Sequence, residues 1–130
     1  MKKKLLIVVN ELSYFISHRL NVATEAKKKG YEVYICYGEN KIKKNNLKIK
    51  KYFKFFHVSI RRGNINPFVE LNSIYSIYCL IKKINPSVLH LVTLKPCLYG
   101  GIASSFLNIK AIIFALPGLG TVYNSKKIEF

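Results

Sequence analysis

The stretch that decides the fold reads His90-Leu91-Val92-Thr93-Leu94-Lys95-Pro96-Cys97-Leu98-Tyr99-Gly100-Gly101. Its β-forming apolar run stops at a Thr, a Lys and a Pro, and a helical pattern begins near the Gly pair. This order predicts a strand over about 87–93, a polar loop, and a helix over about 98–107. In open α/β sheets, the loops at the carboxyl ends of strands hold ligands, so this loop is a candidate site.

Four other segments have the composition of strands, and three of the segments between strands are predicted to be helices. The strands are predicted over 5–9, 31–37, 55–60 and 111–116, and the helices over 15–29, 41–52 and 66–84. The continuous apolar run Leu5–Val9 is typical of a parallel strand buried on both faces, and Ala111–Leu116 is interpreted in the same way. The third helix has the clearest start, because Asn66 is a good N-cap residue and Pro67 favours the first helical position.

The alternation of strands and helices predicts an α/β fold with a doubly wound parallel sheet and right-handed crossovers. The usual strand order of such a sheet, 3-2-1-4-5, reverses between the first and fourth strands, and ligands bind at that point. Asn10, in a turn after the first strand, and the segment Thr93–Lys95 are expected to flank the crevice there. The segment Gly118–Gly120, after the last strand, is expected next along the same edge.

The chain has the length of one domain, 130 residues, and a strongly basic composition. It carries 22 Lys and Arg against 6 Asp and Glu, a formal net charge of +16, which favours anionic partners such as lipid head groups, nucleic acid or sugar phosphates. Nearly all the basic residues are lysines, so specific nucleic-acid recognition is not expected. A solvated lysine-rich surface is the simpler explanation of the charge alone.

The cysteine count and the apolar runs bear on where the protein works. Three cysteines without a CxxC pair favour free thiols in a reducing cytoplasm over disulfides or zinc. The run Leu5–Val9 is too short for a signal peptide, and no run approaches the roughly 20 residues that a membrane span needs. The protein is therefore expected in the cytoplasm, or peripheral on the cytoplasmic face of a membrane.

Gly118-Leu119-Gly120 invites comparison with the glycine-rich loop that binds dinucleotides. Tyr123 stands where that motif needs its third glycine, and the segment follows the last predicted strand instead of the first, so an NAD site is rejected. The two glycines can serve a tight turn with positive φ or the close approach of a ligand, and the sequence leaves both open.

The remaining polar candidates are single residues. His18 and Arg19 lie near the start of the first predicted helix, where backbone N–H groups favour anions, although an exposed Arg and a capping His are the simpler explanation. His90 falls inside a strand pattern and is interpreted as structural. Lys95 is either a point-charge contact to a phosphate or sugar, or one more solvated lysine. No spacing of His, Cys, Asp or Glu suggests a metal site, and no catalytic residue can be assigned.

Taken in order, the motifs resemble those of family 4 glycosyltransferases over the whole chain. The family's segments are F-x-x-S-H-R-L, R-x-x-x-N-P and P-D-[IV]-V-H-x-x-T-x-K-P, followed by two glycine-containing turns. Their counterparts here are Asn10–Leu20, Arg62–Pro67, Pro86–Pro96, Tyr99–Ala103 and Gly118–Gly120. The chain departs from the pattern at Ser87, which replaces the Asp of P-D, and at Pro117, which stands where relatives carry a His or Ser.

The resemblance implies a GT-B enzyme, in which two Rossmann-like domains face each other across a cleft. The amino-terminal domain receives the acceptor, and the carboxyl-terminal domain holds the nucleotide-sugar. Transfer of the hexose retains the anomeric configuration and needs no metal and no cofactor besides the nucleotide-sugar co-substrate. Acceptors are often glycans or lipids linked to polyprenyl phosphate, used in surface polysaccharide or glycolipid biosynthesis, and the lysine excess suits an anionic membrane surface.

Residues 1–130 are thus expected to be the acceptor-side domain, with the donor-binding domain absent and the isolated chain inactive. The substrate-binding residues expected to line the cleft are Asn10, His18, Arg19, Thr93, Lys95, Gly118, Leu119 and Gly120. The alternative is a non-catalytic accessory subunit or membrane-docking module that pairs with a separate donor-binding chain.

Overall fold

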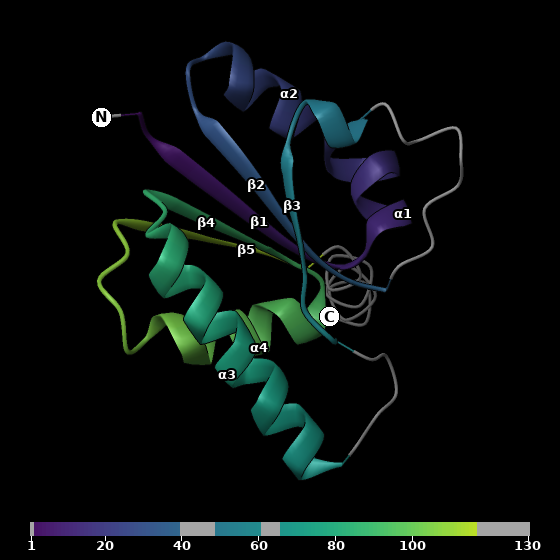
Figure 1. Cartoon of the computed structure of the whole chain (residues 1–130), viewed down its shortest axis with the longest axis vertical. Coiled ribbons are helices and arrows are strands. Elements are labelled where there is room, and N and C mark those ends of the chain that lie inside the picture. The colour runs from purple at the N-terminus through teal and green to yellow at the C-terminus, as the bar shows by residue number, and fades with distance from the viewer. Residues whose placement is uncertain (1, 40–48, 61–65, 117–130) are drawn as a thin grey trace, which may run out of the picture.

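The computed structural model describes residues 2–39, 49–60 and 66–116 of the chain. Five parallel strands form one sheet in the order β3-β2-β1-β4-β5, so the predicted strand order is confirmed. Helices cover the sheet on both sides (Figure 1). The strands are β1 (Lys4–Glu11), β2 (Glu32–Glu39), β3 (Lys54–His57), β4 (Val88–Val92) and β5 (Ala111–Ala115).

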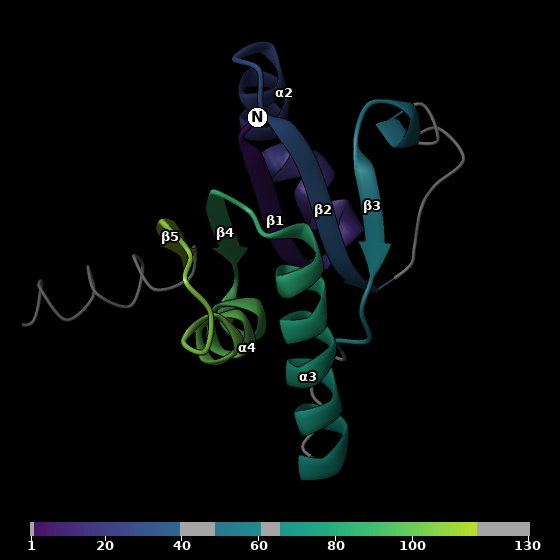
Figure 2. The same cartoon turned by 60° about the vertical axis from the view of Figure 1, so that its left-hand side comes forward.

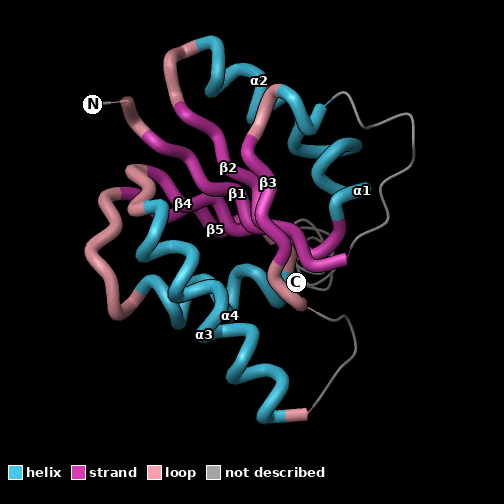
Figure 3. The backbone as a smooth tube through the Cα atoms, in the orientation of Figure 1, coloured by secondary structure: helices cyan, strands magenta, loops and turns pink. Residues whose placement is uncertain are grey.

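The helices divide between the two faces of the sheet. One face carries α1 (Leu12–Tyr14), the π-helix η1 (Phe15–Arg19) and α2 (Leu20–Lys28). The other carries α3 (Pro67–Ile84) and α4 (Leu94–Ser104), and the strands lie between these layers in Figure 3. In Figure 2, α4 lies beside α3 on this face and is seen nearly along its axis, so the two helices cross at a large angle.

The central strand β1 supplies both halves of the core because its side chains alternate between the two faces. Leu6 and Val8 pack toward α3 and α4, whereas Leu5, Ile7 and Val9 pack toward α1, η1 and α2. All five are buried, as the continuous apolar run predicted. Burying a strand on both faces is what makes a parallel sheet of this kind stable.

The predicted start of α3 is confirmed by its capping contacts. The Asn66 side chain accepts a hydrogen bond from the backbone N–H of Phe68 at 3.1 Å, with Pro67 at the first helical position. The helix ends at Ile84, where Asn85 adopts a left-handed conformation with φ of 51°. Asn is one of the few residues that tolerate this conformation at a helix end.

Three predicted boundaries at the carboxyl edge of the sheet are wrong. Asn10 lies in β1 and not in a turn after it, and the helix predicted over 15–29 begins three residues earlier and contains a π-helical segment. The helix predicted from residue 98 begins at Leu94, so Lys95 lies in its first turn and not in a loop. Pro96 does not prevent this early start, because the N–H groups of a first helical turn have no intrahelical partner to lose.

The prediction of a buried last strand is also wrong. In β5, the side chains of Ile113 and Phe114 are 46% and 56% exposed, and they alternate to opposite faces of the sheet. Within the described ranges, β5 pairs only with β4 and lies at the edge of the sheet. An apolar strand is therefore buried or exposed according to its neighbours, which its own composition does not reveal.

The remaining expectations are met in part or fall outside the described residues. The third strand was predicted over 55–60, but regular pairing with β2 ends at His57. The short helix predicted over 41–52 lies largely outside the described residues, which show a 3₁₀ turn over 49–51. No helix in the described ranges is long and apolar enough to cross a lipid bilayer.

Gly100 lets α4 lie close to the sheet. A Cβ atom at Gly100 would lie 2.3 Å from Cδ2 of Leu91, a fully buried residue of β4. No side chain fits at that distance without movement of the helix or of Leu91. Gly100 is therefore a packing residue that lets α4 lie directly against β4.

Candidate functional site

The switch point at which the sequence predicts a crevice is where β1 and β4 run side by side and their connections leave toward opposite faces of the sheet. The last parallel pair between β1 and β4 joins Val8 to Leu91, so Asn10 and Thr93, each two residues further on, both lie at the carboxyl edge of the sheet. The segments α1 and η1 follow β1 at this edge, and α3 and α4 both begin there. Side chains from all of these elements can therefore lie near this edge of the sheet.

Unpartnered buried polar atoms mark this region as a candidate site. In the described part of the chain, five such side-chain atoms have no hydrogen-bond partner: Asn10 Oδ1, Arg19 Nε, Glu70 Oε2, His90 Nε2 and Thr93 Oγ1. Asn10 and Thr93 lie at the carboxyl edge, and Arg19 ends the π-helix that follows β1, whereas His90 lies inside β4, where it pairs with Ile7. A buried polar group without a partner costs about 1–3 kcal/mol, so a cluster of them indicates a place prepared for a ligand or for bound water.

Thr93 holds a strained backbone at the start of α4. Its φ of 71° and ψ of 172° lie in a region that β-branched residues rarely adopt. The conformation is held by two hydrogen bonds, from its N–H to the carbonyl of Ala115 at 2.9 Å and from the N–H of Cys97 to its carbonyl at 3.0 Å. Strain of about 1–3 kcal/mol that the surrounding structure maintains is typical of functional sites.

Arg19 is the last residue of the π-helix η1. Only part of its guanidinium group has a hydrogen-bond partner in the protein. Its Nη1 lies 3.5 Å from the carbonyl of His18, while Nε is buried without a partner. The neighbouring His18 is exposed, stacks on Tyr14 with 4.3 Å between ring centroids, and receives or donates a 2.6 Å hydrogen bond at Ser17. π-Helical turns occur often at functional sites because they shift the side chains that follow them.

His90 is a site residue that the sequence reasoning missed. Burial, and then the positive charge of Arg19, lower the pKa of the His90 side chain. The histidine is therefore neutral near pH 7, and its Nε2 can donate or accept one hydrogen bond. The only sequence signal was a polar residue interrupting an apolar strand, which is equally typical of a structural histidine.

Lys95 lies near the crevice edge but already has an anionic partner. Its Nζ lies 3.2 Å from Oε1 of Glu70, and both side chains are about one-fifth exposed, at 21% and 18%. The ammonium group also lies over the ring of Tyr99, 5.9 Å from its centroid. The ion pair with Glu70 thus limits how freely Lys95 can serve an anionic ligand.

The other predicted positions add little to the site as described. Gly118, Leu119 and Gly120 lie outside the described residues. Within those residues, no group of three His, Cys, Asp or Glu side chains could hold a metal ion. All three cysteines are free thiols, and burial raises the pKa of Cys36 to about 12, which leaves it an unreactive core residue.

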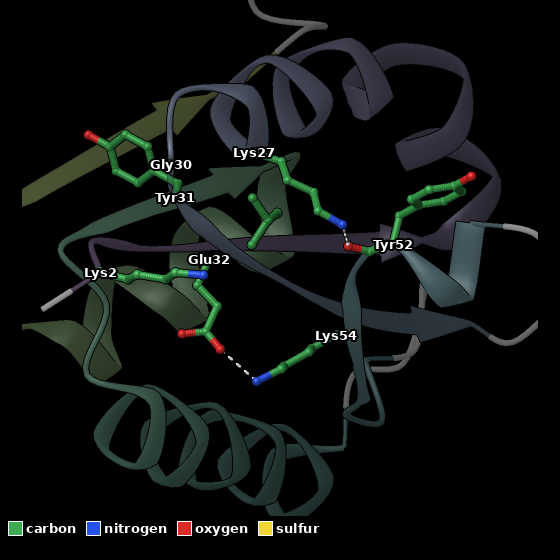
Figure 4. A pocket seen from close by; sticks show the side chains of 8 residues that line it. Lys2, Lys27, Gly30, Tyr31, Glu32, Tyr52 and Lys54 are labelled. Carbon is green, nitrogen blue, oxygen red and sulfur yellow. Dashed lines mark hydrogen bonds and ion pairs between the residues drawn. The ribbon is translucent and has the colours of Figure 1, made fainter.

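A separate cavity of about 290 Å³ opens at the opposite, amino-terminal edge of the sheet (Figure 4). Its polar groups already bind one another, since Lys54 pairs with Glu32 at 2.6 Å and Lys27 donates to the carbonyl of Tyr52. The ion pair lowers the pKa of Glu32 and raises that of Lys54. Because these groups are satisfied without a ligand, the carboxyl edge is the better candidate site.

The lowered pKa of His90 predicts a pH dependence of stability. Between the folded-state pKa and the ordinary value of 6.5, the unfolded chain binds more protons than the folded one. The free energy of unfolding is therefore expected to fall as the pH is lowered below about 6.5. Urea unfolding at a series of pH values measures this decline.

Replacing the histidine identifies the group responsible. His90→Gln is expected to remove the decline, whereas His18→Gln, at an exposed position, is expected to keep it. An unchanged decline in His90→Gln would assign the effect to another group.

Comparison with solved structures defines the class of protein. The fold is that of MurG from Acinetobacter baumannii (TM-score 0.66, 18% identity, 86% of this chain and 34% of that one). It is also similar to a glycosyltransferase from Rickettsia africae, with a TM-score of 0.66 and 23% identity over 87% of this chain and 29% of that one. A UDP-N-acetylglucosamine 2-epimerase is similar as well, with a TM-score of 0.67 and 17% identity over 88% of this chain and 33% of that one. The chain thus has a Rossmann-like α/β fold of the GT-B class and spans about a third of each matched structure.

The family follows from the sequence. A family model described as glycosyl transferase 4-like matches residues 4–129, so the chain belongs to the glycosyl transferase 4-like family. The resemblance in the motifs is confirmed. No curated protein matches the chain.

Proposed function

We propose that residues 1–130 form the acceptor-side part of a retaining glycosyltransferase that moves a sugar from a nucleotide-sugar to a glycan or lipid-linked acceptor. The observation that carries the proposal is the group of unpartnered polar atoms at the switch between β1 and β4, in a chain of the glycosyl transferase 4-like family. Ligands of open α/β sheets bind at such a switch.

The chemistry of the unpartnered atoms suits a sugar. The Nε–H group of Arg19 can donate a hydrogen bond to a ligand, Asn10 Oδ1 can accept one, and the Thr93 hydroxyl can do either. A sugar hydroxyl also donates and accepts, so one pyranose ring presents several groups that these atoms complement. Arg19 adds one positive charge, which suits a phosphate-linked acceptor without demanding it.

The donor nucleotide would bind a further domain, in the same protein or in a separate chain, and no metal or other cofactor would be needed. The reaction would belong to surface polysaccharide or glycolipid biosynthesis on the cytoplasmic face of a membrane. Residues 1–130 alone are then expected to bind acceptor weakly and to transfer no sugar.

Nuclear magnetic resonance titration of the 130-residue chain tests the proposal. A short-chain polyprenyl diphosphate carrying N-acetylglucosamine is one probe, and UDP-N-acetylglucosamine is the other. The acceptor analogue is expected to shift the signals of Asn10, Arg19 and Thr93, and the nucleotide-sugar is expected to shift them less. Efficient transfer by this chain alone, or shifts confined to the cavity at the amino-terminal edge, would contradict the proposal.

A further inference from the structure

The buried polar atoms without partners divide between the two faces of the sheet. In β1, Asn10 continues the alternation of Leu6 and Val8, which pack toward α3 and α4. In β4, His90 alternates with residues that pack toward α3 and α4, so its side chain points to the other face, which also carries Arg19 in η1. The unpartnered nitrogen atoms therefore lie on the η1 side of the sheet, and the unpartnered oxygen of Asn10 lies on the α3–α4 side.

Glu70 belongs to the α3–α4 side as well. It lies in the first turn of α3, and the side of the helix that it occupies continues through Ser73 and Ile77, both buried against the sheet. Its ion pair with Lys95 connects it to the first turn of α4, two residues after Thr93. The carboxylate of Glu70 is therefore fixed where α3 and α4 both begin, at the carboxyl edge of the sheet.

The unpartnered atoms at this place are all oxygens. Oε2 of Glu70 and Oδ1 of Asn10 can only accept hydrogen bonds, whereas Oγ1 of Thr93 can also donate one. Leaving a buried charged group without a donor is more costly than leaving a neutral one, and a hydrogen bond to the charged group is correspondingly stronger. The α3–α4 side of the site therefore lacks donors, and a ligand that supplies O–H groups would satisfy it.

The ion pair between Glu70 and Lys95 determines which charge such a ligand should carry. The Nζ and Oε1 atoms lie 3.2 Å apart and both side chains are mostly buried, so the two charges compensate each other. A phosphate would bring further acceptor oxygens to a place that already lacks donors. A cation would meet the ammonium group of Lys95. An uncharged ligand with hydroxyl groups suits this arrangement best.

We propose that Glu70 is a specificity-determining residue: its Oε2, with Asn10 Oδ1 and Thr93 Oγ1, accepts hydrogen bonds from free hydroxyl groups of an uncharged sugar. The inference rests on the proposed function, in which this sugar is part of the acceptor. A sugar whose hydroxyl groups are methylated has no O–H to donate and would leave these buried oxygens unpaired. Sites built around a hydrogen bond from the ligand reject analogues that lack the donor.

Nuclear magnetic resonance titration of the 130-residue chain with uncharged methyl glycosides tests the role of Glu70. The probes are the methyl glycosides of glucose, galactose, mannose and N-acetylglucosamine, and the fully O-methylated form of each is its matched control. At least one glycoside with free hydroxyl groups is expected to shift the side-chain carboxyl carbon of Glu70 and the amide of Thr93. Its O-methylated form is expected to bind at least about tenfold more weakly. Failure of every glycoside to bind, or equal binding of both forms, would overturn the inference.

The variant Glu70→Gln distinguishes ligand binding from a structural role of this residue. It keeps the size of the side chain but removes its charge, and it is expected to bind the free glycoside about tenfold more weakly. Discrimination against the O-methylated form is expected to fall by the same factor. Equal weakening for both ligands would indicate a purely structural role and would overturn the inference. The shift of the Glu70 carboxyl carbon in the parent provides a test that does not depend on the folding of the variant.

Glu25→Gln is the matched control for this substitution. It removes the carboxylate of another Glu–Lys pair, formed with Lys28 at 3.3 Å on the exposed surface of α2, and is expected to bind every glycoside as the parent does.

The inference and the proposed function would fail in different ways. If the lipid-linked probe shifts Asn10 and Thr93 as expected, while Glu70→Gln binds the glycosides as the parent does, only the role of Glu70 is wrong. If the lipid-linked probe leaves Asn10 and Thr93 unshifted, the proposed function is wrong, and the glycosides still decide the role of Glu70.

Discussion

Replacing Gly38 by alanine is expected to lower the free energy of unfolding by about 3 kcal/mol, at the upper end of the usual cost of overpacking. Gly38 lies in β2, where a Cβ atom would be 2.7 Å from the carbonyl oxygen of Ile60 and 2.8 Å from that of Asn10. Both are backbone atoms, so no side-chain rotation can relieve the contact. Urea unfolding of the variant and the parent measures the difference.

Gly101→Ala provides the matched control for this substitution. A Cβ atom there would lie 3.2 Å from Cε1 of Phe114, the end of an exposed side chain that can move. Alanine also favours a helix over glycine by up to about 1 kcal/mol, so Gly101→Ala is expected to be neutral or stabilising. A similar loss in both variants would show that the crowding at Gly38 is not the cause.

The Gly38 substitution should also affect the candidate site, since one of the two crowded carbonyls belongs to Asn10. Displacement of Asn10 would move its side chain relative to Thr93 across the switch between β1 and β4. Gly38→Ala is therefore expected to weaken acceptor binding under conditions where the variant is still folded.

Replacing Arg19 by methionine is expected to lower sugar transfer by the complete enzyme roughly 10- to 100-fold, since a hydrogen bond to a charged group contributes about 1.5–3 kcal/mol. Nε of Arg19 is buried without a partner, and Nη1 makes one long hydrogen bond, 3.5 Å to the carbonyl of His18, so removing the guanidinium costs the protein only one weak contact. Methionine keeps the apolar stem. The free energy of unfolding is accordingly expected to stay unchanged or to rise, as happens when a residue serves function at the expense of stability.

Two measurements distinguish ligand binding by Arg19 from a purely structural role of this residue. Because the positive charge of Arg19 contributes to the lowered pKa of His90, Arg19→Met is expected to raise the pKa of His90 in an NMR titration. Lys28→Met, on the exposed end of α2, is the control and is expected to change neither transfer nor that pKa. Loss of transfer accompanied by an equal loss of stability would show that Arg19 supports the fold and not the ligand.

Much of the fold was predictable because local signals and packing agreed. The run Leu5–Val9 could only be a strand buried on both faces, and Asn66-Pro67 defined the start of α3 through capping chemistry that depends on a few neighbouring residues. The strand order followed from the alternation of strands and helices, since right-handed crossovers leave few arrangements. Family membership followed in turn from the motifs placed on that framework.

The candidate site was predictable only in outline. Asn10, Arg19 and Thr93 were expected at the crevice, and each has an unpartnered buried polar atom. His90 was set aside as structural, and the pairing of Lys95 with Glu70 joins residues 25 positions apart that no spacing rule connects. Which polar groups are left without partners depends on all neighbouring elements at once.

The amino-acid sequence by itself determined the strands and their parallel order, because apolar periodicity and capping act over a few residues, and it predicted a candidate site at the carboxyl edge of the sheet. The tertiary structure alone decided that α4 begins at Leu94, that Thr93 is strained, and that Ile113 and Phe114 remain exposed. These features arise from contacts between segments far apart in the chain. The stretch His90–Gly101 was therefore recognisable from the sequence as part of a candidate site. Which of its polar groups have partners depends on the residues that pack beside it.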